Sequence, residues 1–240
     1  MERAYFISDA HLGADKKEIE KIKEERLLAF FNAIQDQADY LYIVGDFFEF
    51  WFEYRQVVPK CNLRILAKLL QLAEAGVTVR YLAGNHDLWL GSFLEREIGI
   101  AIYHEPLEAV HNDLKLYIAH GDGLTSGDAK YKILKRIFKN PVNICLYRML
   151  HPDIGIPLAK FVSRRSRTKG ENKFATDFRN FAVAKFKQGY DGVILGHTHR
   201  AIFEIIDDSY YVNLGDWMRR FTYLELNGVH FQLNSWNHGP

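Results

Sequence analysis

Gly45-Asp46-Phe47-Phe48-Glu49-Phe50-Trp51 follows a strand-like run at residues 40–44, and this stretch decides the fold. A short run of β-branched and aromatic residues that ends at a glycine and a carboxylate is typical of a buried strand with a polar site at its carboxyl end. Similar runs occur at residues 4–8, 77–83, 114–119 and 192–195, and stretches of helical periodicity separate the first four runs. This alternation predicts a layered α/β fold.

The remaining elements follow from periodicity and turn residues. We expect helices at about residues 22–34, 63–75 and 90–98, the second of which ends at Gly76, a residue suited to a C-cap. After Gly196 the pattern changes to successive strands at residues 201–206, 210–213, 221–226 and 229–234. The last two flank Asn227-Gly228, a strong hairpin signal, so an antiparallel sheet is expected to close the domain.

Residues 124–175 differ from the rest of the chain because they contain no convincing strand. Apolar residues at Tyr131, Leu134 and Phe138 suit a short amphipathic helix. The basic stretch at residues 163–170 is expected to be a loop. We therefore interpret the chain as a single domain, 1–240, with residues 124–175 inserted in it as a helical lid; 240 residues are enough for one substantial core.

Polar motifs come directly after each of the five strand-like runs. Because ligands bind outside the carboxyl ends of strands in open α/β sheets, these side chains are expected to converge there. Each motif alone also fits a capping or surface role, but a complete ordered set at five strand ends favours one site. The motifs are Asp9-Ala10-His11, Gly45-Asp46, Gly84-Asn85-His86-Asp87, His120-Gly121-Asp122 and Gly196-His197-Thr198-His199.

The donor types of these motifs predict a metal centre. Carboxylate and amide oxygens mixed with imidazole, without thiolate, suit Mn²⁺, Fe or Zn²⁺ and disfavour a structural zinc cluster. Asp46 is a candidate to bridge two divalent ions through its two carboxylate oxygens. A pair of ions about 3.5 to 4 Å apart can activate water and clamp a phosphoryl group, which predicts a phosphoesterase.

The motif series D-x-H, G-D, G-N-H-D, H-G and G-H-x-H resembles that of the calcineurin-like metallophosphoesterase superfamily. The resemblance implies a four-layer α-β-β-α sandwich of two sheets between helices. It further implies that His86 lies beside the scissile phosphate and that Asp87 orients it by hydrogen bonding. It implies one metal site formed by Asp9, His11, Asp46 and His199, and a second formed by Asp46, Asn85, His120 and His197.

A closer resemblance is to the UDP-2,3-diacylglucosamine pyrophosphatases of lipid A synthesis. Residues 45–51 match that family's G-D-x-F-E-x-W, and Leu214-Gly215-Asp216-Trp217 also matches. The chain departs from the best-known branch of that family at His86, where the branch has arginine, and at Phe52-Glu53-Tyr54, where it has an Asp-rich stretch. These departures bear on the substrate rather than on the metal chemistry.

Substrate-binding residues are predicted in and beside the lid. Arg164 and Arg165 can face the phosphates of a nucleotide-linked substrate, although a solvated surface run is the usual interpretation of such a stretch. The closer resemblance implies that four further residues lie near the substrate: Asp128, Tyr131, Ser166 and Lys173.

Composition restricts location and partners. The formal charge of +1 provides no overall attraction for nucleic acid, so no stable nucleic-acid partner is expected. Cys61 and Cys145 form neither a disulfide framework nor a thiolate site, which suits a reducing compartment. The chain has no apolar run of the ~20 residues that span a membrane, and its N-terminus lacks a signal-peptide pattern. We expect a cytoplasmic protein that contacts the cytosolic face of the inner membrane peripherally.

These features together predict a metal-dependent hydrolase, most simply with Mn²⁺, that cleaves the pyrophosphate of a UDP-linked diacyl sugar to a sugar phosphate and UMP. One alternative is a phosphodiesterase or pyrophosphatase that acts on another nucleotide compound. A second is a scaffold that keeps the fold without catalysis, which the complete ligand set disfavours.

Overall fold

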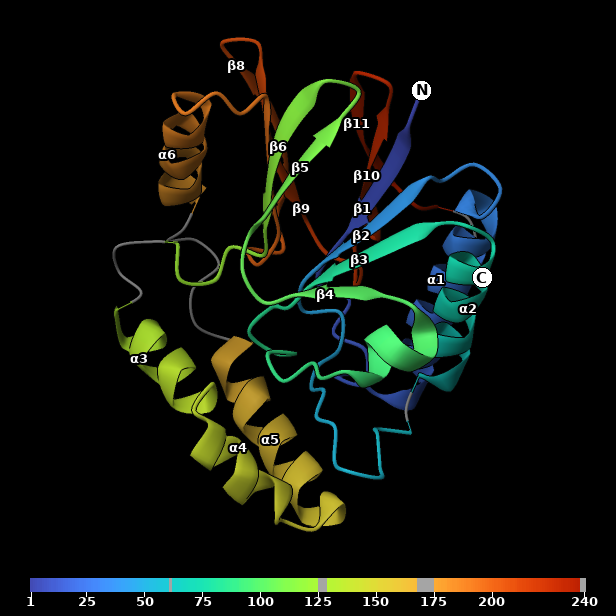
Figure 1. Ribbon diagram of the computed structural model, residues 1–240, viewed down its shortest axis with the longest axis vertical. Coiled ribbons are helices and arrows are strands. Elements are labelled where there is room, and N and C mark those ends of the chain that lie inside the picture. Colours follow the sequence, from blue (N-terminus) through green and yellow to red (C-terminus); the bar gives the residue numbers. More distant parts are fainter. Residues whose placement is uncertain (61, 125–128, 168–174, 238–240) are drawn as a thin grey trace.

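The computed structural model describes residues 1–60, 62–124, 129–167 and 175–237. Its strands form a six-stranded and a five-stranded sheet (Figure 1). The first sheet has the order β11 (His230–Ser235), β10 (Thr222–Asn227), β1 (Arg3–Ile7), β2 (Tyr40–Val44), β3 (Thr78–Leu82) and β4 (Ala101–Tyr103). The second has the order β5 (Leu107–His111), β6 (Leu114–Ala119), β7 (Gly192–Leu195), β9 (Ser209–Leu214) and β8 (Ala201–Ile206).

Each sheet has a parallel part, with antiparallel strands at one margin of the first sheet and at both margins of the second. Strands β1 to β4 run parallel, and β10 pairs antiparallel with β1. In the second sheet β6, β7 and β9 are parallel, with β5 and β8 antiparallel at the two edges. Parallel strands covered on both faces require apolar residues at nearly every position, and β2 (Tyr40–Val44, YLYIV) has this composition.

Helices cover the outer faces of both sheets. Helices α1 (Lys17–Ile34) and α2 (Leu63–Glu74) lie against the first sheet, and α6 (Ala175–Phe186) lies against the second (Figure 1). The alternation of side chains along β1 shows the layering, because Tyr5 and Ile7 pack under α1 and α2 whereas Ala4 and Phe6 pack between the two sheets. The four-layer α-β-β-α prediction is therefore confirmed.

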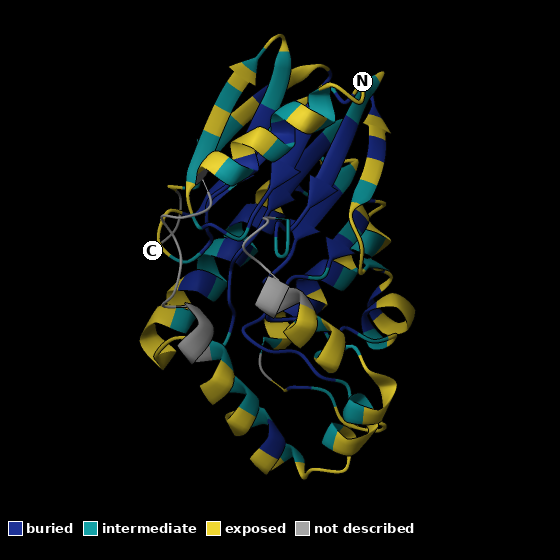
Figure 2. Cartoon of the chain, turned by 90° about the vertical axis from the view of Figure 1, so that its left-hand side faces the viewer, coloured by how far each residue is buried: buried dark blue, intermediate teal, exposed yellow. Residues whose placement is uncertain are grey.

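Three further helices lie together at the end of the sheets where the motif loops gather (Figure 1). They are α3 (Ala129–Phe138), α4 (Pro141–Arg148) and α5 (Pro152–Arg167). Asn140 caps α4 by accepting a hydrogen bond from the Val142 amide at 2.9 Å, and Pro141 fits the first turn. Their outer surfaces are largely exposed (Figure 2). That they act as a lid stays a prediction.

Several sequence expectations about secondary structure are wrong. The strands β4 and β5 were not expected, because β4 has three residues and neither has a long periodic run. The expected helix at 90–98 is reduced to a π-helical turn, Leu94–Ile98, that ends at the left-handed Gly99. The expected basic loop is helical as far as Arg167, because α5 continues through it. The hairpin turn falls at Gly228-Val229, one residue later than expected, since Asn227 pairs with His230.

Candidate active site

The predicted ligands lie in tight turns at the carboxyl ends of the strands. Eleven residues other than glycine have a positive φ within the described part of the chain, and five of these are predicted ligands: Asp9, His11, Asp46, His197 and His199. Such a backbone costs roughly 1–3 kcal/mol at each residue and accumulates at functional sites. The turns therefore hold these side chains in place at some expense to stability.

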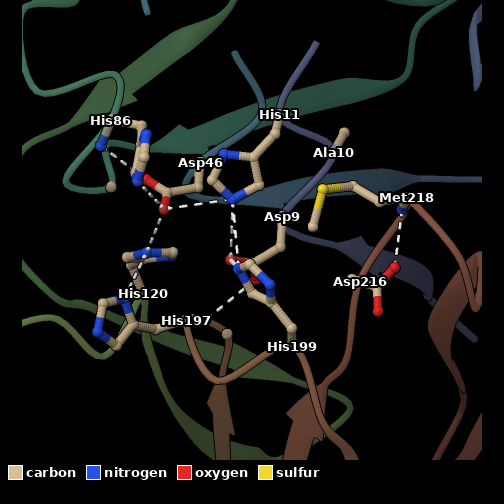
Figure 3. Close-up of polar contacts among 12 residues, drawn as sticks. Asp9, Ala10, His11, Asp46, His86, His120, His197, His199, Asp216 and Met218 are labelled. Atoms are coloured by element: carbon tan, nitrogen blue, oxygen red, sulfur yellow. Dashed lines mark hydrogen bonds and ion pairs between the residues drawn. The ribbon is translucent and has the colours of Figure 1, made fainter. Parts of the chain in front are cut away.

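The predicted ligands form a cluster with two halves, and Asp9, His11 and His199 make up the first half. Asp9 Oδ1 lies 3.2 Å from His199 Nε2 and 3.9 Å from His11 Nε2, and the two imidazole nitrogens are 3.3 Å apart. All three side chains point toward one another, although 188 positions separate His11 from His199 (Figure 3). These donor atoms lie close enough together to hold one metal ion.

The other half is formed by Asp46, His120 and His197. Asp46 Oδ2 lies 3.3 Å from His120 Nε2, which in turn lies 3.3 Å from His197 Nδ1. The same Asp46 oxygen is 3.7 Å from His11 Nε2, so Asp46 stands between the two halves (Figure 3). This is the position that a bridging carboxylate requires.

Asn85 is the remaining predicted metal ligand, and its amide oxygen has an unusual environment. Its Oδ1 atom is buried and has no hydrogen-bond partner among the described residues. Because an unpaired buried acceptor costs about 1–3 kcal/mol, such an atom calls for a missing partner. The neighbouring His86 amide donates to Asp46 Oδ1 at 2.8 Å, which places Asn85 beside Asp46. The orphaned amide oxygen and the mixed oxygen and imidazole donors fit a pair of divalent cations.

Electrostatics in the cluster are strongly coupled. Burial alone would raise the pKa values of Asp9 and Asp46, but the facing histidines outweigh it and lower both. Burial would likewise lower the pKa of His120, yet Asp46 raises it well above its usual value. By contrast, burial and the His120 charge lower the pKa of His197 to about 4. A protonated His120 thus supplies positive charge to the protein without metal.

His86 lies at the edge of the cluster, with Nε2 3.9 Å from Asp46 Oδ2. The expectation that Asp87 orients it is wrong. Asp87 accepts instead from the amides of Gly84 at 2.7 Å and Phe47 at 2.8 Å, and from the Tyr81 hydroxyl. These buried donors need an acceptor, and they draw the carboxylate away from the imidazole. Burial, followed by the charge of Asp46, raises the pKa of Asp87 to about 6.

Glu49 contacts the imidazole rings of His11 and His86, which Asp87 does not contact. The sequence did not identify Glu49 as a functional residue. Its side chain is fully buried, and Oε2 lies 3.1 Å from His11 Nδ1 and 3.6 Å from His86 Nδ1. A carboxylate that accepts from the far nitrogen of a ligating imidazole fixes the tautomer and orientation of that ring. The available signal was an acidic residue among the aromatic residues 47–51.

Lys23 is a second residue that the sequence did not identify. Its ammonium is buried and donates to the carbonyls of Ala10 at 3.1 Å and His11 at 2.9 Å, while it pairs with Glu20 at 2.7 Å. It therefore ties the Asp9–His11 turn to α1. A lysine on the same helical face as Leu27 and other buried residues was the signal that could have revealed it.

The predicted substrate residues are not brought into the cluster by described contacts. Asp128 and Lys173 lie outside the described residues. Tyr131 lies in the first turns of α3, and Arg164, Arg165 and Ser166 lie in the last turn of α5, where only the helical backbone is described. Their role stays a prediction.

Two hollows are lined by the described residues, and one of them reaches the cluster at His120. An open cleft of about 940 Å³ is lined by residues of the 52–58 and 88–97 segments, including Trp89, and by His104, Lys139, and Ile144 and Arg148 of α4. A smaller hollow of about 200 Å³ is lined by His120, Asp122 and Lys135. None of the predicted ligands lines the larger cleft, so a molecule held there would reach the cluster only with another part of its length.

Comparisons with known proteins agree with this geometry. The family model of calcineurin-like phosphoesterases matches residues 3–201. A UDP-2,3-diacylglucosamine hydrolase of Porphyromonas gingivalis is 32% identical over 97% of both chains, and one of Azotobacter vinelandii is 30% identical over 95% of this chain and 96% of its own. A solved structure described as a novel archaeal phosphodiesterase is 17% identical, covers 97% of this chain and 99% of its own, and has a TM-score of 0.51.

The archaeal structure supports the fold alone at that identity, whereas the family model and the two relatives extend over most of the sequence. The chain therefore belongs to the calcineurin-like phosphoesterase family and is a hydrolase.

Proposed function

We propose that this hydrolase cleaves the pyrophosphate of UDP-2,3-diacylglucosamine to 2,3-diacylglucosamine 1-phosphate and UMP. The observation that carries the proposal is the gathering of Asp9, Asp46 and four histidines at the carboxyl ends of strands from both sheets, in a chain similar over nearly its whole length to hydrolases of that name. A pyrophosphate has two adjacent charged phosphorus centres, and such a cluster suits the attack of water on one of them.

The metal pair would be held by the predicted ligands, with Asp46 shared between Asp9, His11 and His199 on one side and Asn85, His120 and His197 on the other. When bound, the two ions would supply charge stabilisation of the phosphoryl group and activation of water. His86 would direct Nε2 toward the leaving-group oxygen and provide a proton or a hydrogen bond to it. Glu49 would keep the His11 ring oriented through Nδ1.

We propose Mn²⁺ as the native metal, because mixed carboxylate, amide and imidazole donors without thiolate suit it, as they also suit Fe and Zn²⁺. Metal analysis of protein purified without added metal, followed by stripping and reloading with each ion, tests this choice. Protein that contains two equivalents of metal and is reactivated best by Mn²⁺ would support the proposal. A protein that retains far less metal would favour the scaffold alternative instead.

We further propose that residues 124–175 form a lid and that α3 to α5 bring the protein to the cytosolic face of the inner membrane. No helix in the described residues is both long and apolar enough to cross a bilayer. Among the side chains that the structure describes, eleven large apolar ones are nevertheless exposed on or between these three helices, and such an accumulation marks an interaction surface. They are Ile133, Leu134, Ile137, Val142, Leu146, Met149, Leu150, Ile154, Leu158, Phe161 and Val162.

Co-sedimentation with anionic phospholipid vesicles tests this membrane contact. Met149→Glu, at a side chain that is 78% exposed, should weaken binding, because burial of a carboxylate in the interfacial region is costly. Val229→Glu, on the exposed β10–β11 turn, is the matched control and should bind as the parent does. Equal binding of the two variants would argue against this surface.

For the substrate itself, Asp128, Tyr131, Arg164, Arg165, Ser166 and Lys173 are proposed to contact the nucleotide-linked sugar. The decisive assay compares hydrolysis of UDP-2,3-diacylglucosamine, other nucleoside diphosphate compounds and a nitrophenyl phosphodiester by one preparation. Formation of UMP at the highest kcat/KM from the diacyl sugar nucleotide would support the assignment. A preference for another nucleotide would instead favour the alternative phosphodiesterase or pyrophosphatase activity.

A further inference from the structure

Helix α5 reaches the catalytic cluster through one hydroxyl group. Ser163 Oγ lies 2.5 Å from His86 Nδ1 and 3.0 Å from Glu49 Oε1, and it also lies 3.3 Å from the Glu49 carbonyl. The three residues come from different parts of the chain, 77 and 114 positions apart from Ser163. The inserted helix is thus in direct contact with the imidazole that faces the substrate in the proposed function.

Proton counting determines the direction of these hydrogen bonds. The Ser163 hydroxyl has one proton, and both Glu49 oxygens that face it are acceptors, so the hydroxyl donates to Glu49. Its own oxygen then accepts, and the atom that faces it at 2.5 Å is His86 Nδ1. His86 must therefore carry a proton on Nδ1. The opposite arrangement would bring the lone pairs of the serine and the carboxylate together at 3.0 Å.

The consequence concerns the other nitrogen of the ring. With Nδ1–H held by Ser163, His86 turns Nε2 toward Asp46 Oδ2, 3.9 Å away, on the side where the ligands gather. Glu49 links this arrangement to the metal cluster, because its second oxygen accepts from His11 Nδ1 at 3.1 Å. One buried carboxylate thus orients His11 directly and His86 through the hydroxyl.

A second contact attaches the same face of α5 to the cluster. Lys160, one helical turn before Ser163, donates to the Gly13 carbonyl at 3.2 Å, just beyond the turn that contains Asp9 and His11. Earlier in α5, Gly155 approaches two tyrosines closely: an added Cβ would lie 2.7 Å from the Tyr54 hydroxyl. The position of α5, and with it that of Ser163, is therefore set by contacts with Gly13, Tyr54 and helix α4.

We propose that Ser163 is a positioning residue for His86. By accepting from Nδ1–H it keeps a proton on that nitrogen and leaves Nε2 directed at the substrate, where Nε2 donates only when the ring is protonated on both nitrogens; α5 thus contributes to catalysis without contacting the reacting atoms. The role of His86 rests on the proposed function, whereas its tautomer and its partner do not.

The test uses the Zn²⁺-loaded protein, its metal-free form and five variants. Ser163→Ala removes the hydroxyl, Ser163→Thr retains it, and Lys160→Met removes the other contact of α5. Asp153→Asn, at a side chain near the start of the same helix that is 92% exposed, is the control. Histidine-selective NMR reports the protonated ring nitrogen, and His86→Gln identifies the signal of His86. Thermal unfolding verifies that each variant is folded.

We expect Ser163→Ala to lose the Nδ1–H preference of His86 and to lower kcat for a nitrophenyl phosphodiester by about 10- to 100-fold with KM and metal content unchanged. Ser163→Thr and Asp153→Asn should retain both the Nδ1–H preference of His86 and kcat. A Ser163→Ala variant with an unchanged His86 signal would overturn the proposal whatever its activity, since Ser163 would then be a docking contact like Lys160. If the diacyl sugar nucleotide is not a substrate, the proposed function is refuted but the role of Ser163 is not. The NMR signal of His86 and kcat for the nitrophenyl phosphodiester are both measured without that compound.

Discussion

Replacement of Lys23 by methionine tests whether a buried cation on α1 holds the ligand turn. The ammonium donates to the carbonyls of Ala10 and His11, at 3.1 and 2.9 Å, and no exposed surface remains on the side chain. Methionine has a similar length and apolar stem but no donor. The substitution therefore removes the hydrogen bonds while it preserves most of the packing.

The size of the effect follows from these partners. Each buried carbonyl that loses a charged donor costs roughly 1–3 kcal/mol, and the two together should lower the free energy of unfolding by about 3 kcal/mol after the gain from burial of the thioether. Asp15 and Glu20 are 33% and 18% exposed, so water can replace the ammonium at their carboxylates and they add little. In a chain of this size, this loss corresponds to a fall in Tm of about 6 to 12 °C.

Urea unfolding of the metal-free protein measures the stability, and metal titration measures the second effect. Because Asp9 and His11 have left-handed backbones that Lys23 helps to hold, metal affinity should fall by about 10- to 100-fold. Lys21→Met is the control on the same helix, since Lys21 is 72% exposed. A Lys23→Met protein within about 1 kcal/mol of the parent, with unchanged metal affinity, would refute the assigned role.

Three further outcomes are expected. Asp46→Ala should reduce bound metal below one equivalent and abolish hydrolysis, because Asp46 stands between both halves of the cluster; two retained equivalents in metal analysis would contradict this. Gly84→Ala should lower the free energy of unfolding by about 1–3 kcal/mol and weaken metal binding, since its Cβ would collide with Asp46 Oδ1; denaturant curves and metal titration check both effects. In the folded, metal-free protein, pairing with Asp46 raises the pKa of His120 above its value of 6.5 in the unfolded chain. The stability that this pairing contributes is therefore fully present below pH 6.5 and is lost as the pH rises through the pKa of the folded state. Metal binding needs neutral imidazole, so the difference in Tm between loaded and stripped protein should widen with pH, and a constant difference would argue against this pairing.

Much of the architecture could be predicted because it depends on local patterns. Strands such as β2 and β6 are continuous apolar runs bounded by glycine or polar residues, and their predicted limits agree with the structure. Strand β4 could not be predicted in the same way. It has three residues and exists because its backbone pairs with β3, which is a partner that no local pattern reveals.

The site likewise contains some residues that local sequence patterns predict and others that depend on tertiary packing. Its predicted ligands follow the ends of predicted strands, so pairing of β1 with β2 brings Asp9 near Asp46. Their approach to His120 and His197 depends on the packing of the two sheets against each other. The role given to Asp87 was wrong because adjacency to His86 in sequence does not determine which donors a carboxylate meets in the core. Glu49 and Ser163 acquire their relation to His86 only through the packing of a loop and an inserted helix on it.

The amino-acid sequence by itself determined the α/β class, the family and the polar residues at the strand ends, because periodicity and motif spacing are properties of neighbouring residues. Only the tertiary structure decided that Lys23 holds the first ligand turn, that Glu49 stands behind His11, and that α5 delivers a hydroxyl to His86. Hydrogen bonds of this kind act over about 3 Å, so they exist only after segments distant in the chain have packed together.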